Sequence, residues 1–146
     1  MSPLAGRPSQ GRASRRRPVI LIADDTIDTR DLYADYFGSR GFIVITAHDG
    51  AAAMRVAFLH VPDVIVMDLA MPQYDGITAT ERIKADPRMA RTRVILLTGY
   101  PFAFETRALE AGADLFLRKP CLPERLVRHV NALRRGQSPG SDTPAT

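Results

Sequence analysis

Residues 64–68 read VIVMD, an apolar run that ends in an acidic side chain. Three other apolar runs also end in polar side chains: residues 19–25 are VILIADD, residues 94–98 are VILLT, and residues 115–119 are LFLRK. Short apolar runs that alternate with amphipathic segments predict an α/β protein, with parallel strands covered by helices. Because parallel strands of an open sheet end at one edge, the polar side chains that close the runs should meet there. These side chains are Asp24, Asp25, Asp68, Thr98 and Lys119.

Three carboxylates at one sheet edge predict a site for a hard cation. Carboxylates that crowd together repel one another, and an ion such as Mg²⁺ between them keeps them ionised. An aspartate beside a divalent cation, a lysine and a hydroxyl has the chemistry needed to accept a phosphoryl group on a carboxylate.

The alternation of apolar and amphipathic segments predicts five strand–helix units. Gly41 is expected to end the first helix, and prolines are expected to end later helices. The predicted strands are about 18–23, 42–46, 63–67, 93–97 and 114–117, and the predicted helices are about 27–39, 50–60, 76–85, 101–111 and 122–135, the fourth with Pro101 in its first turn.

Length and composition indicate one globular domain between two tails. The chain has 146 residues, of which 45% are hydrophobic and 25% charged. Residues 1–17 and 136–146 lack apolar periodicity and are rich in small and polar residues, so we expect disorder there and a folded domain over 18–135. Only a short tail follows the last predicted helix, and we expect no DNA-binding output module in it.

The charge distribution gives no indication of nucleic-acid binding. The net charge is +4, but residues 1–17 carry five arginines and no acid, which leaves −1 for the rest of the chain. A single cysteine excludes an internal disulfide and is typical of a cytoplasmic protein. No apolar run approaches the roughly 18 residues of a membrane span.

Four motifs, which follow one another along the chain, carry a specific resemblance to a known family. They are Asp24–Asp25, MDLAMPQYDGI at 67–77, LLTG at 96–99 and FLRKP at 116–120. With these motifs the chain resembles, over residues 18–135, the receiver domain of two-component response regulators of the stand-alone, single-domain type. The resemblance implies a flavodoxin-like (βα)5 doubly wound sheet with strand order 2-1-3-4-5.

The same resemblance implies the phosphoacceptor and the metal ligands. Asp68 would accept the phosphoryl group in the presence of Mg²⁺. Asp25 and Asp68 would bind the ion directly, Asp24 mostly through a water molecule, and the backbone carbonyl of Ala70 would be a further ligand. Ala70 and Tyr100 would frame the approach of the water that hydrolyses the aspartyl phosphate.

Three further residues would act during phosphorylation and signalling. Lys119 would pair with Asp68 and then with a phosphoryl oxygen, with a cis bond to Pro120. Thr98 would hydrogen-bond another phosphoryl oxygen, and Phe116 would be the switch aromatic whose ring moves inward with the threonine. Gly99 would leave room for the donor. Phe116 is also compatible with a plain core position.

Particular residues argue against three other functions. An aspartyl-phosphate phosphatase on a similar fold needs a second aspartate two residues after the nucleophile, where this chain has Ala70. A flavodoxin-type flavin site needs a Ser/Thr/Gly-rich loop after the first strand, whereas residues 23–28 read ADDTID. A receiver that has lost phosphorylation is disfavoured by the full acidic set.

The expected protein is therefore a signalling phosphoacceptor, which assists its own phosphorylation and dephosphorylation, and not an enzyme with a separate substrate. The donor would be a sensor histidine kinase or a phosphotransfer protein. The output partner would bind the face formed by the predicted helix 101–111, strand 114–117 and helix 122–135, with no role for membranes or nucleic acid. Six arginines on these elements favour an acidic partner, namely Arg107, Arg118, Arg125, Arg128, Arg134 and Arg135.

Overall fold

The fold is a five-stranded parallel sheet. The computed structural model describes residues 16–71, 75–99 and 104–136. The strands are β1 (Val19–Ala23), β2 (Ile43–Ala47), β3 (Val64–Asp68), β4 (Arg93–Thr98) and β5 (Leu115–Arg118). They pair in parallel in the order β2-β1-β3-β4-β5, which confirms the predicted fold class and strand order.

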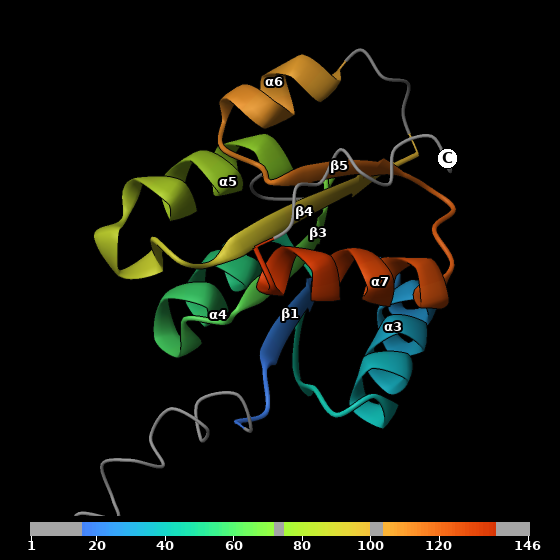
Figure 1. Cartoon of the computed structure of the whole chain (residues 1–146). Helices are drawn as coiled ribbons and strands as arrows, with labels where there is room; N and C mark the ends of the chain where they lie inside the picture. The colour runs from blue at the N-terminus through green and yellow to red at the C-terminus, as the bar shows by residue number, and fades with distance from the viewer. Residues whose placement is uncertain (1–15, 72–74, 100–103, 137–146) are drawn as a thin grey trace, which may run out of the picture.

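Helices cover both faces of the sheet (Figure 1). They are α3 (Ile27–Ser39), α4 (Gly50–His60), α5 (Gly76–Ala85), α6 (Glu105–Glu110) and α7 (Pro123–Arg134), with a short 3₁₀ helix η1 (Pro87–Met89) after α5. α3 and α7 lie side by side on one face, and α4, α5 and α6 lie on the other. None of the helices in the described segments is long and apolar enough to cross a bilayer.

The interiors of the central strands β1, β3 and β4 are apolar because both faces of the sheet are buried there. Successive side chains of a strand point to opposite faces. One set packs with α3 and α7 and the other with α4, α5 and α6. The first set includes Ile20, Ile22, Val64, Val66, Ile95 and Leu97, and the second includes Leu21, Ala23, Ile65, Met67, Val94 and Leu96.

The local sequence accounts for where most elements begin and end. Asp49 caps α4 by accepting a hydrogen bond from the N–H of Ala52, and Asp75 caps α5 in the same way through Thr78. Gly41 has φ +94°, the left-handed conformation that ends α3. Predicted and observed boundaries agree within one or two residues for each predicted strand and for each predicted helix except the fourth, whereas η1 was not predicted.

The fourth predicted helix, 101–111, is shorter in the structure. α6 starts at Glu105, and Phe104 before it is not part of the α-helix. Pro101, which was expected in the first turn, lies outside the described residues. The six residues of α6 bury Ala108 but leave Leu109 exposed, so only a short apolar stripe holds this helix to the sheet.

The amino edge of the sheet receives the end of the arginine-rich segment. Arg17 donates hydrogen bonds to the carbonyls of Gly41 and Phe42, and Arg16 pairs with Asp63 at 3.4 Å. Asp63 also accepts the N–H of Val19 at 2.7 Å. Arg16 and Arg17, the last residues of the predicted N-terminal tail, therefore contact the amino edge of the sheet. Residues 1–15 and 137–146 lie outside the described part of the chain.

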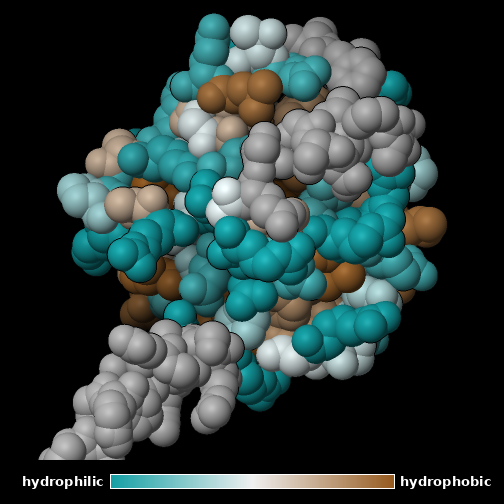
Figure 2. Space-filling model, in the orientation of Figure 1, coloured by the Kyte–Doolittle hydropathy of each residue, from teal (hydrophilic) through white to brown (hydrophobic). Residues whose placement is uncertain are grey.

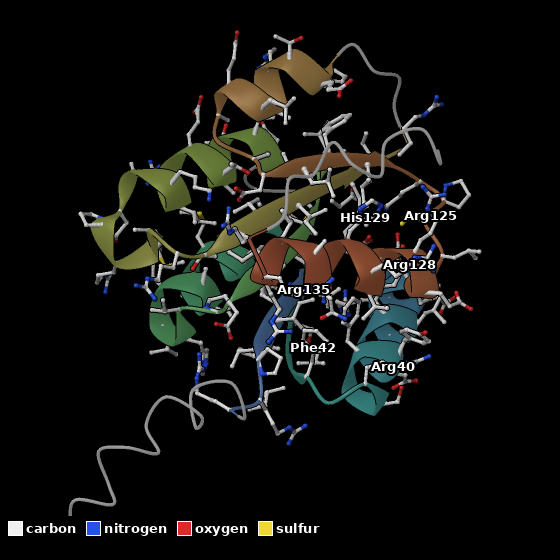
Figure 3. All side chains as sticks on the ribbon, viewed as in Figure 1. Arg40, Phe42, Arg125, Arg128, His129 and Arg135 are labelled. Atoms are coloured by element: carbon white, nitrogen blue, oxygen red, sulfur yellow. The ribbon has the colours of Figure 1, made fainter. Side chains whose placement is uncertain are left out.

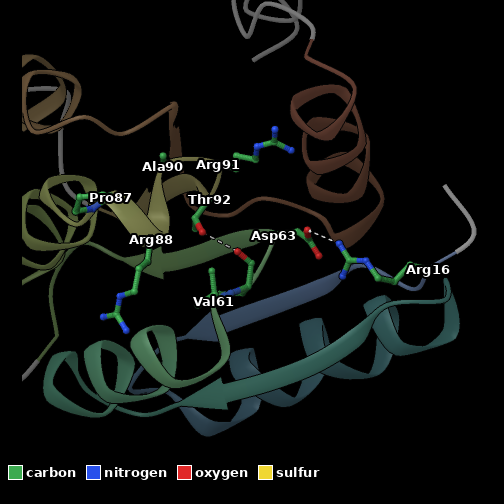
Figure 4. Close-up of a pocket in the computed structure, with 9 residues that line it drawn as sticks. Arg16, Val61, Asp63, Pro87, Arg88, Ala90, Arg91 and Thr92 are labelled. Carbon is green, nitrogen blue, oxygen red and sulfur yellow. Dashed lines mark hydrogen bonds and ion pairs between the residues drawn. The ribbon is translucent and has the colours of Figure 1, made fainter. Parts of the chain in front are cut away.

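A shallow hollow of about 390 Å³ lies at this amino edge (Figure 4). Its wall includes two ordered contacts, Arg16 with Asp63 and the hydroxyl of Thr92 with the carbonyl of Pro62 at 2.8 Å. The hollow is lined by Arg16, Val61, Pro62, Asp63, Pro87, Arg88, Ala90, Arg91 and Thr92. Because it lies at the amino edge, it is separate from the polar side chains that close the strands.

Gly76 shows how closely α5 begins against β3. A Cβ at this position would lie 2.9 Å from the carbonyl oxygen of Asp68 and 3.0 Å from the Cα of Leu69. We expect Gly76→Ala to lower the free energy of unfolding by about 2 kcal/mol, because backbone atoms must move apart.

The matched control is Gly38→Ala in α3, where a Cβ would meet nothing within 4 Å. Alanine there should raise stability by about 0.5–1 kcal/mol, since helix propensity alone changes. Denaturant unfolding of both variants tests the contact. A Gly76→Ala protein as stable as the wild type would contradict it.

Candidate functional site

Three aspartates meet at the carboxyl edge of the sheet. Asp24 and Asp25 follow β1, and Asp68 is the last residue of β3, the neighbouring strand. Their carboxylate oxygens lie within 4.8 Å of one another. Asp24 and Asp68 are buried, at 2% and 8% exposure, whereas Asp25 is open to solvent. The site thus has two shielded carboxylates and one accessible one.

Lys119 neutralises the two buried carboxylates together. Its Nζ lies 3.0 Å from Oδ2 of Asp24 and 3.0 Å from Oδ2 of Asp68. The lysine follows β5, so its side chain reaches across the end of β4 to the ends of β1 and β3. The contact with Asp68 was predicted from the sequence, and the equally short contact with Asp24 was not.

The two buried aspartates use their other oxygens to hold the turns that follow the strands. Oδ1 of Asp24 accepts the N–H of Thr26 at 2.9 Å, and Oδ1 of Asp68 accepts the N–H of Ala70 at 3.1 Å. Arg30, on the first turns of α3, donates to the backbone carbonyl of Asp24 at 2.8 Å. This arginine was not identified as a site residue from the sequence. The one sequence feature that could have indicated its contact with Asp24 is its position six residues later, at the start of the predicted helix.

Burial and charge oppose each other at Asp68. Burial raises the pKa of this carboxyl group, and the hydrogen bonds and charge of Lys119 partly offset the increase. For Lys119, burial alone would lower the pKa, but hydrogen bonds to Asp24 and Asp68 raise it overall. The lysine therefore remains a cation that favours the ionised carboxylates.

Thr98 and Phe116 lie on adjacent strands beside these charges. Thr98 ends β4 and is fully buried. Phe116 pairs with Leu96 in the register of β4 and β5, so Thr98, two residues beyond Leu96, faces the same side of the sheet. The ring of Phe116 is also buried, at 8% exposure, in the core cluster on the side of α4, α5 and α6.

The rim of the site is open next to Thr98. Gly99 is exposed, and a Cβ there would meet no heavy atom within 4 Å. Ala70 is partly buried and carries only a methyl group.

The bond between Lys119 and Pro120 is cis, as the resemblance implied. Tyr100, the other residue expected to frame a water molecule, lies outside the described residues.

The donor set fits a hard divalent cation. The group consists of carboxylate oxygens, with no histidine or cysteine ligand among its three members. Mg²⁺ prefers oxygen ligands and retains several waters, so an open site with few protein ligands suits it. The exposed Asp25 carboxylate gives such an ion access from solvent.

Comparisons with known proteins agree with this geometry. The sequence matches the family described as response regulator receiver domain over residues 20–131. Chemotaxis protein CheY of Bacillus subtilis is 35% identical over 113 residues, which are 77% of this chain and 93% of that protein. RpaA of Synechocystis, a DNA-binding dual master transcriptional regulator, is 34% identical over 119 residues, 81% of this chain but 49% of its own length. The chain thus spans about half of several of its curated relatives.

A solved structure extends the agreement to three dimensions. The chemotaxis response regulator CheY4 of Vibrio cholerae superimposes with a TM-score of 0.76 at 26% identity, covering 81% of this chain and 99% of that one. Family match, sequence identity and shared fold lead to one conclusion: this chain belongs to the response regulator receiver domains of two-component signalling systems.

Proposed function

We propose that this receiver takes a phosphoryl group on Asp68 and passes the signal to a protein partner. The observation that carries the proposal is the position of Asp68. It is a buried strand-end carboxylate within 4.8 Å of two other carboxylates and 3.0 Å from the ammonium group of Lys119. Phosphoryl transfer needs positioning and charge neutralisation more than covalent help from the protein, and these groups supply both.

The donor would be a phosphohistidine on a sensor kinase or a phosphotransfer protein. A carboxylate oxygen of Asp68 attacks the phosphorus, an O–P bond forms, the P–N bond breaks, and its electron pair returns to the imidazole nitrogen. The product is an acyl phosphate on Asp68. Lys119, which already contacts this carboxylate, then pairs with a phosphoryl oxygen, and Thr98 donates a hydrogen bond to another. In this way the chain assists its own phosphorylation.

The residues that would hold Mg²⁺ are Asp24, Asp25, Asp68 and the backbone carbonyl of Ala70. When bound, the ion supplies positive charge beside the phosphoryl oxygens. Asp24 shares its Oδ2 with Lys119 and its Oδ1 with the N–H of Thr26, which supports a role through a bound water. Asp25, exposed to solvent, is the better direct ligand.

The switch would pass from Thr98 to Phe116. Both side chains are buried on the same side of the sheet. A movement of Thr98 toward the phosphoryl group would change the packing around the ring of Phe116. The change would reach the face formed by α6, β5 and α7.

That face is rich in arginine and would bind an acidic partner. Figure 3 shows Arg125 and Arg128 on α7 and Arg135 directly after it, and hydrophilic side chains lie over this helix in Figure 2. Arg107 and Arg134 lie over the rings of Phe104 and Phe42, at 5.9 and 5.6 Å from the ring centroids. The aspartyl-phosphate phosphatase alternative finds no support, because Ala70 offers no acid.

The first prediction concerns the phosphoacceptor. Incubation with acetyl phosphate and Mg²⁺ should add one phosphoryl group to the wild type, and Asp68→Asn should abolish the addition. Asp86→Asn is the control, because Asp86 caps η1, away from the site. Intact-protein mass spectrometry measures the product. A phosphoryl group that still appears on the Asp68→Asn variant would show that another residue accepts it.

The second prediction concerns the metal. Asp25→Ala should weaken Mg²⁺ binding by about tenfold or more, since one carboxylate ligand is lost. It should also raise the metal-free melting temperature slightly, because like charges repel less. Asp31→Ala, an exposed aspartate of α3, should leave Mg²⁺ affinity unchanged. Calorimetric titration is the test, and equal affinities for the wild type and Asp25→Ala would remove Asp25 from the ligand set.

The third prediction concerns the lifetime of the aspartyl phosphate. The methyl group of Ala70 cannot orient an attacking water, so Ala70→Asn should speed hydrolysis about tenfold, the worth of one hydrogen bond in the transition state. Ala70→Leu introduces a side chain of similar size to asparagine but without polar atoms, and it should not increase the rate of hydrolysis. The decay rate of each phosphorylated protein decides the question. Equal decay of the Asn and Leu variants would argue against water orientation at this position.

A further inference from the structure

A buried hydrogen bond connects α3 to the loop that carries Lys119. The hydroxyl of Tyr33 donates to the backbone carbonyl of Cys121 at 2.6 Å. The two residues are 88 positions apart in the sequence, and Tyr33 is 4% exposed. Cys121 lies two residues after Lys119, so the bond holds the backbone close to the root of the lysine side chain.

The loop is held on both sides of Lys119. On the β5 side, the N–H of Lys119 donates to the carbonyl of Thr98 at 2.7 Å. On the α7 side, the carbonyl of Cys121 accepts the hydrogen bond of Tyr33. The lysine side chain is long and has many rotamers, yet its Nζ is shared between Asp24 and Asp68 at 3.0 Å each. A fixed backbone at its base makes that shared position possible.

Tyr33 is well placed to act as a rigid support. Its ring packs in the core cluster that includes Phe37, Leu126 and Val130, on the face covered by α3 and α7. Burial, followed by the nearby Cys121 and Asp24, raises the pKa of Tyr33 far above its usual value, so the hydroxyl keeps its proton and remains a donor. The same helix holds the end of β1 through Arg30 and the carbonyl of Asp24.

We infer that Tyr33 is a positioning residue for Lys119, acting through the carbonyl of Cys121 and not by contact with the reacting groups. A purely structural role would affect stability alone. A positioning role would affect phosphorylation of Asp68, and only while Lys119 is present. The inference rests on the proposed function and goes beyond it by adding a residue outside the acidic group.

The test is a double-mutant cycle of four proteins: wild type, Tyr33→Phe, Lys119→Ala and the double variant. Tyr33→Phe keeps the ring and removes the hydroxyl. The rate of phosphorylation by acetyl phosphate with Mg²⁺ should fall roughly three- to tenfold in Tyr33→Phe, as expected for a small displacement of a catalytic group. The same substitution should have almost no effect in the Lys119→Ala background. Mg²⁺ affinity should stay within about twofold, because no proposed ligand is altered.

Thr92→Val is the matched control. The Thr92 hydroxyl is buried and donates to a backbone carbonyl, that of Pro62, at 2.8 Å, but at the opposite edge of the sheet (Figure 4). Both Tyr33→Phe and Thr92→Val should lower the melting temperature by a few degrees, since each leaves a buried carbonyl without its donor. Only Tyr33→Phe should slow phosphorylation.

Each result has a defined meaning. An unchanged rate in Tyr33→Phe, or an equal loss with and without Lys119, overturns the inference while the proposed function stands. A wild type that accepts no phosphoryl group overturns both. If Lys119→Ala reacts too slowly to measure, a crystal structure of Tyr33→Phe decides. The inference expects a longer distance from Lys119 Nζ to Asp24 or Asp68, and two distances still at 3.0 Å would overturn it.

Discussion

The structure depends on one electrostatic constraint, the repulsion among three carboxylates at the end of a buried sheet. β1 and β3 are neighbouring strands, so the aspartates at their carboxyl ends necessarily lie close together. Lys119 relieves the repulsion between the two buried carboxylates by contacting both. Hydrogen bonds hold the loop on either side of this lysine, one to the carbonyl of Thr98 and one from Tyr33 of α3 to the carbonyl of Cys121.

Much of the fold could be predicted from the sequence because the sheet is buried on both faces. Runs such as 64–68 and 94–98 have no polar residue until the last position, and few other structures accommodate them. α6 was harder to predict, since its six residues bury little and its apolar pattern is weak. The ends of the other helices were predictable from Gly41 and from prolines, whose local backbone preferences do not depend on the tertiary structure. The aspartates that cap α4 and α5 were not identified from the sequence.

The candidate site was predictable as a set of residues but not as a set of contacts. Strand ends identified Asp24, Asp25, Asp68, Thr98 and Lys119, because parallel topology alone brings them to one edge. The contact of Lys119 with Asp24 depends on the reach of a side chain across β4, which residue spacing does not encode. The bond between Tyr33 and Cys121 was equally hidden, since its acceptor is a backbone carbonyl that any residue would provide.

The close approach of Gly76 to β3 has a mechanical consequence. The N–H of Gly76 donates to the carbonyl of Leu69 at 2.7 Å, and no side chain separates its Cα from the backbone of Asp68. The backbone at the start of α5 is therefore in direct contact with the backbone at the end of β3. A displacement of the Asp68 backbone would therefore also move the start of α5, which lies on the opposite face of the sheet from α7.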